Sequence, residues 1–262
     1  MAQDFAYRNY SHTQGKVKNG GGRAARQRSG PEPTRHVLID HDAAAAVVAV
    51  ADPRGPILEP EAGQGLLTRA LARGGAEVTA FEQDPLLAAK LGAHTRGIRV
   101  VRADFAGVKA PRAAFAVVGG LTSARVVDWC LAAAALTSAT LVIQAAALSG
   151  EGPWDLATVR SWPWFDWQAH GNVARTAFRP ALAGDATIVR ITRRAEPLVR
   201  DGDAYLAMIR AAFAGPDTVH AALGVSYPGL DAALAAAGVD AADPAGRVHP
   251  ARWVRLHERL SA

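Results

Sequence analysis

The chain has 262 residues, half of them hydrophobic, and carries a formal net charge of +5. This length fits one large domain or one domain with a small satellite, and the apolar fraction excludes a wholly disordered chain. A single cysteine, Cys130, excludes a disulfide scaffold and a cysteine-rich zinc or iron–sulfur site. No apolar run approaches the roughly 20 residues of a spanning helix, and the polar N-terminus does not look like a secretory signal. We therefore expect a cytoplasmic protein.

The first 35 residues account for the net charge. They hold seven Lys and Arg residues against two acids, so the remaining residues together are close to neutral. The glycines Gly20–Gly22 and the prolines Pro31 and Pro33 break any helix there. We predict a flexible basic arm over residues 1–35 that neutralises RNA phosphates, with a solubilising tail as the alternative. The expected RNA-binding residues are Lys16, Lys18, Arg23, Arg26, Arg28 and Arg35.

After the arm, short apolar strands alternate with helices. Because single helices separate the strands, we predict parallel pairing and an α/β fold, a doubly wound Rossmann-like sheet over residues 36–196. Strands are expected at Pro56–Pro60, Glu77–Glu82, Ile98–Ala103, Phe115–Val118 and Ala139–Ala145. Helices are expected at Asp42–Ala51, capped by Asp42, and at Gly65–Arg73, Asp84–Thr95 and Val126–Ala135.

The character of the chain changes at about Pro197. Short helices joined by Pro and Gly turns follow, and no strand pattern is present. We therefore predict a small all-α C-terminal domain over residues 197–262. Its helices are expected at Ala204–Ala214, Asp217–Leu223, Leu230–Ala237 and Pro250–Leu260.

Ligands of doubly wound sheets bind beyond the carboxyl ends of the strands, so the turns there are the places to search. The first expected strand ends at Glu59, and Gly63 and Gly65 follow just before a helix. Glycines at this point let backbone N–H groups and the helix N-terminus approach a nucleotide closely. On its own, one pair of glycines is a weak signal.

Acids also end the next two expected strands. Glu82 can accept hydrogen bonds from both ribose hydroxyls, or it is a solvated strand end. Asp104 can accept from an adenine amine or cap a helix, and Phe105 can stack on a ring or lie in the core. Because three successive strand ends carry an acid, the sequence favours a cofactor that contains a nucleoside.

From about Thr34 to the C-terminus the chain resembles the erythromycin-resistance (Erm) methyltransferases, relatives of the dimethyladenosine transferases. The resemblance implies a cytoplasmic, monomeric enzyme that uses S-adenosyl-L-methionine to methylate adenine N6 in 23S ribosomal RNA, or in a ribosomal subunit precursor, and confers macrolide-type resistance. It also implies that the helical tail faces RNA. The matching stretches are 57–68, 78–85, 101–105, 126–131, 136–141, 162–167 and 178–180 with Asp185.

The resemblance assigns roles to matching positions. Glu59 and Gly63–Gly65 would shape the cofactor pocket, Glu82 would hold the ribose and Asp104 the adenine. Phe178 would help hold a flipped-out target base, because aromatic stacking replaces lost base stacking.

Two positions depart from the family pattern. Glu61 stands where the family has its first cofactor glycine, and adds bulk and negative charge beside the cofactor's own carboxylate. The family's catalytic Asn-Ile/Leu-Pro-Tyr/Phe is replaced by Gly120, Leu121, Thr122 and Ser123. The Leu121 carbonyl and the Thr122 and Ser123 hydroxyls are the remaining candidate acceptors for an adenine amine. Loss of one such preorganised contact typically costs about 10²–10³ in rate.

Some aromatic and basic residues have two interpretations. Arg35 and His36 replace a Gln-Asn pair of the family, and His36 is either a base for a different target or an ordinary surface histidine. Trp162, Trp164 and Trp167 either pack on the sheet edge, which their place in the family pattern favours, or stack on bases. No metal site is expected, because the spacing of His36, His41, His94 and His170 matches no ligand set.

Three functions remain open from the sequence. The first is an rRNA methyltransferase, with the usual target or an altered base or atom. The second is a catalytically degenerate Erm-like protein that binds RNA or the ribosome. The third is a small-molecule methyltransferase, which the basic arm and the helical tail disfavour.

Overall fold

A computed structural model describes residues 35–95, 97–144, 154–215 and 218–261, and every structural statement below concerns these residues. Five expected RNA-binding residues of the arm lie outside them: Lys16, Lys18, Arg23, Arg26 and Arg28. The chain from Arg35 onward forms one compact unit.

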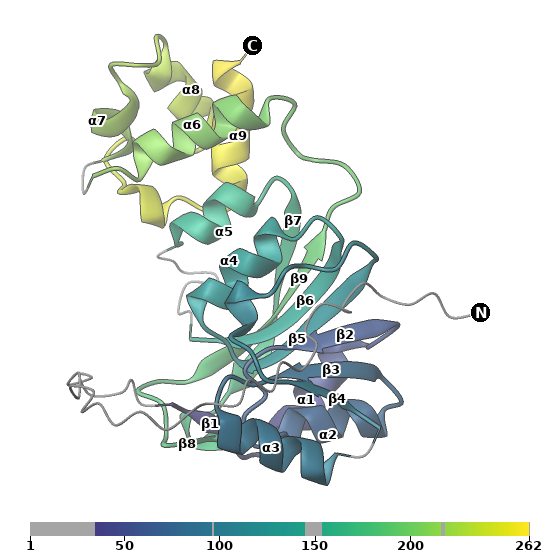
Figure 1. The fold of residues 1–262 in the computed structure, drawn as a ribbon. Helices are drawn as coiled ribbons and strands as arrows, with labels where there is room; N and C mark the ends of the chain where they lie inside the picture. The colour runs from purple at the N-terminus through teal and green to yellow at the C-terminus, as the bar shows by residue number, and fades with distance from the viewer. Residues whose placement is uncertain (1–34, 96, 145–153, 216–217, 262) are drawn as a thin grey trace, which may run out of the picture. The chain divides into compact units, whose positions relative to one another are not determined.

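A seven-stranded sheet forms the centre of this unit, in the order β4-β3-β2-β5-β6-β9-β7 (Figure 1). Its parallel strands are β2 (Pro56–Glu59), β3 (Glu77–Phe81), β4 (Arg99–Val101), β5 (Phe115–Leu121) and β6 (Leu136–Ile143). The predicted Rossmann-like sheet is confirmed by these strands. The structure adds an antiparallel edge, in which β9 (Ala186–Arg193) pairs with β6 and β7 (Phe165–Val173) pairs with β9.

Alternation along the strands divides the apolar side chains between two cores. One core lies under α1 (His41–Ala51) and α2 (Leu66–Arg73), and receives Ile57, Val118, Val142 and Ile188 from four neighbouring strands. The other lies under α4 (Ala124–Ala132) and receives Leu58, Val117, Leu141 and Val189. Each of these is the sequence neighbour of one of the four residues in the first core. Both faces of the sheet are therefore covered, as a doubly wound sheet requires.

Helix ends follow local capping chemistry. The cap of α1 is Asp40, whose carboxylate accepts from the Ala43 N–H at 2.8 Å, so the predicted Asp42 cap is wrong by two residues. Asp42 instead lies in the first turn, where its charge suits the helix dipole. Asp84 caps α3 (Pro85–His94) by accepting from two N–H groups.

The strand order places a crevice between β2 and β5. The chain adds β3 and β4 on one side of β2, then returns to build β5 and β6 on its other side. Loops after β2 and β5 therefore diverge, which is where ligands bind in such sheets. A small two-stranded sheet of β1 (Val37–Leu38) and β8 (Phe178–Arg179) supports this region.

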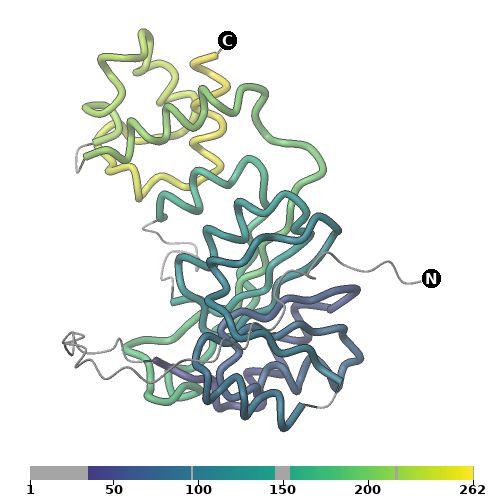
Figure 2. Tube along the Cα trace, in the orientation of Figure 1, coloured from purple at the N-terminus to yellow at the C-terminus, as the bar shows by residue number. Residues whose placement is uncertain are grey.

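The C-terminal region is helical, as predicted, and Figure 2 traces the chain through it. It contains α6 (Gly202–Ala212), α7 (Val219–Leu223), α8 (Leu230–Ala237) and α9 (Pro250–Leu260). Its core also takes in Trp154, and Val159 of α5 (Leu156–Ser161). The Tyr205 hydroxyl donates to the Val159 carbonyl at 2.8 Å, so this core includes residues on both sides of position 197. The domain boundary at residue 197 stays a prediction. None of the described helices has the length and apolar character needed to cross a membrane.

Candidate nucleoside and substrate site

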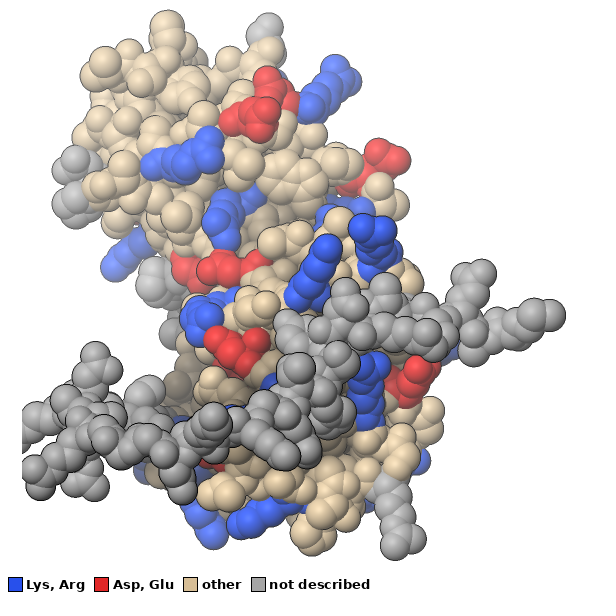
Figure 3. Space-filling view, in the orientation of Figure 1, with Lys and Arg blue, Asp and Glu red and all other residues tan. Residues whose placement is uncertain are grey.

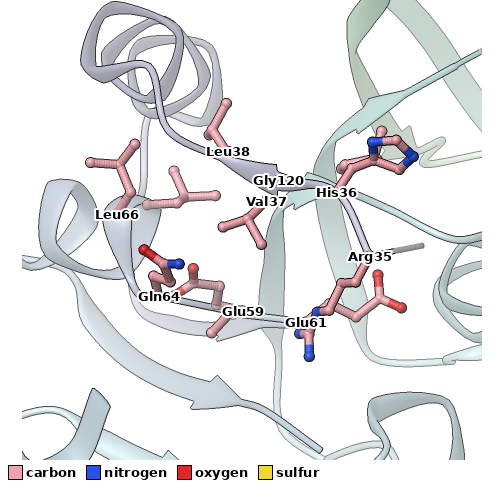
Figure 4. A pocket seen from close by; sticks show the side chains of 13 residues that line it. Arg35, His36, Val37, Leu38, Glu59, Glu61, Gln64, Leu66 and Gly120 are labelled. Carbon is pink, nitrogen blue, oxygen red and sulfur yellow. The ribbon is translucent and has the colours of Figure 1, made fainter. Parts of the chain in front are cut away.

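A pocket lies at the carboxyl ends of β2 and β5, at the crevice that the strand order creates (Figure 4). Its walls come from the segment Arg35–Leu38, the loop after β2, the start of α2 and the end of β5. It thus brings together Glu59, Glu61 and Gly63 with Gly120 and Leu121, which the sequence assigned to cofactor binding and to catalysis. Of the described residues, no group of His, Cys, Asp or Glu is arranged to hold a metal ion.

Two glycines shape the loop after β2. Gly63 and Gly65 have φ of +58° and +77°, a region that favours glycine over residues with a side chain. A Cβ on Gly65 would lie 2.1 Å from Leu91 Cδ1, so α3 closes tightly over the start of α2. Glu61 adopts φ of +50° without being glycine, so its backbone is strained.

Glu59 ends β2 and is buried, with 1% of its surface exposed. Its Oε2 has no hydrogen-bond partner among the described residues. Burial raises the pKa of Glu59 to about 8, although Thr68 and Arg69 offset part of the effect. At neutral pH the carboxyl is therefore mostly protonated and can both donate and accept a hydrogen bond in the pocket.

Glu82, directly after β3, is fully buried and has hydrogen bonds on both oxygens. It accepts from the Gly63 N–H at 2.8 Å and from the Asp84 N–H at 2.7 Å. The guanidinium of Arg35 completes the set: Nη1 donates to Oε1 at 2.7 Å, and Nη2 donates to Oε2. A ribose bound at Glu82 would have to compete with Arg35.

The sequence assigned Arg35 to the RNA-binding arm. The structure places it in the pocket, where the hydrogen bonds with Glu82 raise the pKa of its guanidinium further. Sequence reasoning missed this pair. Its one signal was that Arg35 and His36 replace a pair of family residues near the cofactor.

Asp104 and Phe105 follow β4. Asp104 acts as a helix cap and Phe105 lies in the core, the alternatives to ligand binding that the sequence left open. Asp104 caps the short 3₁₀ turn Phe105–Gly107 by accepting from the Ala106 N–H, and it pairs with Arg125 at 3.0 Å. The Phe105 ring is 2% exposed and packs against Phe81 and Trp129. In this conformation Phe105 offers no face to a ligand, whereas Asp104 remains accessible.

The loop after β5 is tied to the loop after β2. Glu61 accepts from the Ser123 hydroxyl at 3.1 Å and from the Ser123 N–H at 3.3 Å. Ser123 is the N-cap of α4, so the Glu61 carboxylate lies at the N-terminus of that helix, where negative charge is favourable. The two departures from the family pattern are therefore in contact with each other.

Of the other loop residues, Gly120 and Leu121 line the pocket. The Thr122 hydroxyl donates to the Gly120 carbonyl at 2.7 Å, and the Thr122 N–H donates to Val142 in β6. A Cβ on Gly120 would meet Leu38 Cβ at 4.0 Å, an ordinary contact. Packing therefore does not require glycine at position 120.

Several aromatic side chains that the sequence offered for base stacking pack inside the protein instead. Phe178 is 2% exposed and lies in the core under α1, so a base could reach its ring only after a local rearrangement. Trp167, in the edge strand β7, is buried and donates to the Ser161 hydroxyl, while Trp162 and Trp164 pack against the cores. His36 lines the pocket with Nδ1 2.8 Å from the Pro180 carbonyl.

Charge on the described surface is mixed. On the face in Figure 3, Lys and Arg side chains are scattered, with Asp and Glu between them, and they do not merge into one patch. This agrees with the near-neutral composition of the chain after the arm.

Comparisons with known proteins agree with this geometry. A family model described as "Ribosomal RNA adenine dimethylase" matches residues 34–262. An "rRNA adenine N-6-methyltransferase" of Saccharopolyspora erythraea is 38% identical over 257 residues, which are 91% of this chain and 67% of that protein. "Mycinamicin-resistance protein MyrB" of Micromonospora griseorubida is 30% identical over 215 residues, 77% of this chain and 69% of that protein.

A solved structure is also similar. The crystal structure of the 23S rRNA methyltransferase ErmE aligns with a TM-score of 0.76 and 36% identity, covering 86% of this chain and 99% of that chain. Sequence, fold and pocket position thus agree. The chain belongs to the ribosomal RNA adenine dimethylase family and, within it, to the Erm-type methyltransferases.

Proposed function

We propose that this protein transfers a methyl group from S-adenosyl-L-methionine to an adenine of 23S ribosomal RNA, and that this confers macrolide-type resistance. The observation that carries the proposal is the pocket at the carboxyl ends of β2 and β5, which Glu59 and Gly63 line and where the Gly63 N–H donates to Glu82. We further propose that it acts in the cytoplasm as a monomer, on 23S rRNA or a ribosomal subunit precursor.

The pocket residues fit S-adenosyl-L-methionine in three respects. The positive φ of Gly63 and Gly65 keeps side chains away from a closely bound ligand. The buried Oε2 of Glu59 has no hydrogen-bond partner within the part of the chain that the structure describes, and a ligand can provide one. The Glu82 carboxylate is the kind of acceptor that vicinal ribose hydroxyls require, once Arg35 leaves it.

When bound, the cofactor supplies an electrophilic methyl group on a positively charged sulfur. Residues of this chain would orient the two reactants. Glu59 and Glu82 hold polar groups of the nucleoside side, and the backbone of Gly120 and Leu121 faces the opposite wall. Because Gly120 has no side chain to accept from an adenine amine, we expect slower N6 methylation than in a protein with asparagine there.

The arm and the helical tail would bind RNA. The arm carries all of the net charge, and electrostatic binding of this kind weakens steeply with salt. We expect that deletion of residues 1–33 flattens the dependence of RNA affinity on salt. An unchanged slope would leave the arm as a solubilising tail.

Methyl transfer from isotopically labelled S-adenosyl-L-methionine to 23S rRNA tests the proposal. Free rRNA and ribosomal subunits serve as substrates, and mass mapping identifies the nucleotide and the atom. We expect incorporation into adenine N6. Label on another base or atom would show that the remodelled loop has changed the target.

A catalytically degenerate RNA-binding protein is the second candidate. Two observations favour it. Arg35 forms an ion pair with Glu82, and Glu61, in place of the family's first cofactor glycine, binds Ser123 of the altered catalytic loop. Calorimetry with S-adenosylhomocysteine separates the candidates, because an enzyme must bind it and a degenerate protein need not. RNA binding without S-adenosylhomocysteine binding or methyl transfer would establish the second candidate.

A further inference from the structure

Arg35 bridges two parts of the pocket that are distant in the sequence. It lies just before β1, and its partner Glu82 ends β3, 47 residues later. The pair is bidentate, a geometry that fixes both groups and is stronger than a single hydrogen bond. It forms on the one carboxylate that the family pattern assigns to the ribose.

Glu82 has little capacity left for a ligand. Two backbone N–H groups and two guanidinium N–H groups already donate to its two oxygens. The backbone donors belong to the loop after β2 and to the turn before α3, so they are fixed by the fold. Arg35 is the donor that can leave, because its side chain is 33% exposed while that of Glu82 is fully buried.

We propose that Arg35 sets ligand affinity in the cofactor pocket: it binds Glu82 when the pocket is empty, and the ribose hydroxyls of the ligand must displace it. The inference rests on the proposed function only in requiring that the ligand be a nucleoside with a vicinal diol. In its present position Arg35 is also attracted by the charges of Glu61 and Asp84. Cofactor affinity is therefore set partly by the stability of an internal ion pair.

A second arginine–carboxylate pair, outside the pocket lining, provides a matched control. Arg160 pairs with Asp128, but their side chains are 44% and 55% exposed. Exposed pairs contribute little because water and salt screen them, whereas a buried carboxylate depends on its partner. Loss of Arg35 should therefore affect ligand binding strongly, and loss of Arg160 only slightly.

The test measures S-adenosylhomocysteine binding to the full chain by calorimetry. Arg35→Gln should bind it about tenfold to a hundredfold more tightly than the wild type, because a charge-assisted pair no longer competes. Arg160→Gln should change the affinity by less than about threefold. The ligand-free Arg35→Gln protein should melt at a lower temperature than the wild type, while its shift on ligand binding should be larger.

A double-mutant cycle tests whether the gain in ligand affinity depends on Glu82. In a Glu82→Gln background, Arg35→Gln should leave the affinity unchanged, because the competing pair is already absent. Arg35→Lys keeps the charge but loses the bidentate geometry, so it should bind with intermediate affinity. This milder variant also decides the question if Arg35→Gln does not fold.

The outcomes separate the two proposals. Equal or weaker binding by Arg35→Gln and Arg35→Lys, with clear binding by the wild type, would overturn this inference and leave the proposed function intact. A gain that persists in the Glu82→Gln background would also overturn it. No binding by any variant would contradict the methyltransferase function, and the inference with it.

Discussion

The two walls of the pocket differ in how they hold their polar groups. The first wall lies at the ends of β2 and β3, where Glu59 lines the pocket and Glu82 binds the lining residues Arg35 and Gly63. These two acids are 1% and 0% exposed, and Glu82 has hydrogen bonds at 2.7–2.8 Å. The second wall lies where the loop after β2 meets the loop after β5: Glu61 of one loop and Ser123 of the other are both exposed and are joined at 3.1 and 3.3 Å. The first wall keeps the acids and later glycines of the family pattern, and the second departs from it.

Burial explains this difference. A buried polar group that loses its partner costs the full desolvation free energy, so few substitutions are tolerated on the first wall. On the exposed wall, water replaces a lost partner at little cost. The loop after β5, which we propose faces the base, can therefore change its residues without destabilising the buried acids.

The largest effect should come from Glu59, on the buried wall. The pKa of Glu59 in the folded protein, about 8, lies above the ordinary value of 4.5, so the folded protein holds a proton that the unfolded chain releases between these values. The free energy of unfolding should therefore fall as pH rises from 4.5 to about 8, by on the order of 1 kcal/mol per pH unit. Urea unfolding at several pH values measures this slope.

Glu59→Gln should remove that slope, because it leaves no proton to release. Glu77→Gln, at an exposed position of β3, is the matched control and should keep the wild-type slope. A slope that survives in Glu59→Gln would show that the buried wall does not depend on this carboxyl.

A smaller effect is expected at Gly120, on the exposed wall. Gly120→Asn supplies an acceptor for an adenine amine, and its Cβ has room beside Leu38. We expect at least about a tenfold faster transfer to adenine N6 in rRNA, measured with labelled cofactor. Gly120→Ala adds the Cβ without the acceptor and should give no comparable gain. Equal rates in both variants would show that position 120 does not face the base.

The smallest effect should come from the Glu61–Ser123 contact on the exposed wall. A double-mutant cycle of Glu61→Ala and Ser123→Ala, measured by urea unfolding, should give a coupling below about 1 kcal/mol, because both groups are exposed. A coupling of about 2 kcal/mol or more would mean that the loop after β5 is held as firmly as the buried wall. The comparison between the walls would then fail.

Much of the fold could be predicted because each parallel strand is a short apolar run between helices. The antiparallel edge was missed because β7 alternates only at its start, where Phe165 and Trp167 are buried and Asp166 between them is half-buried. Residues 168–172 are all exposed. Gly171, at φ of +151° in an irregular part of the β7–β9 pairing, interrupts the pattern that would have indicated a strand.

The site was predicted less completely. Glu59, Gly63 and Glu82 follow strand ends, so topology alone gathers them. The pairs Arg35–Glu82 and Glu61–Ser123 join residues 47 and 62 positions apart, and depend on how the segment before β1 and the loop after β5 pack. The role of Phe105 was ambiguous, because the sequence does not distinguish a phenylalanine buried in the core from one that stacks on a ligand. Only the packing distinguishes the two.

The shared core of α5 and the C-terminal helices limits how this protein can be recombined with its relatives. The backbone N–H of Trp154 donates to the Gly246 carbonyl at 2.6 Å, and the Tyr205 hydroxyl donates to the Val159 carbonyl. A chimera joined at residue 197 would pair each half with a foreign partner across this core. Grafts that carry a helical tail from one relative to another should therefore also carry α5 and Trp154, so that the tail keeps the surface on which it folds.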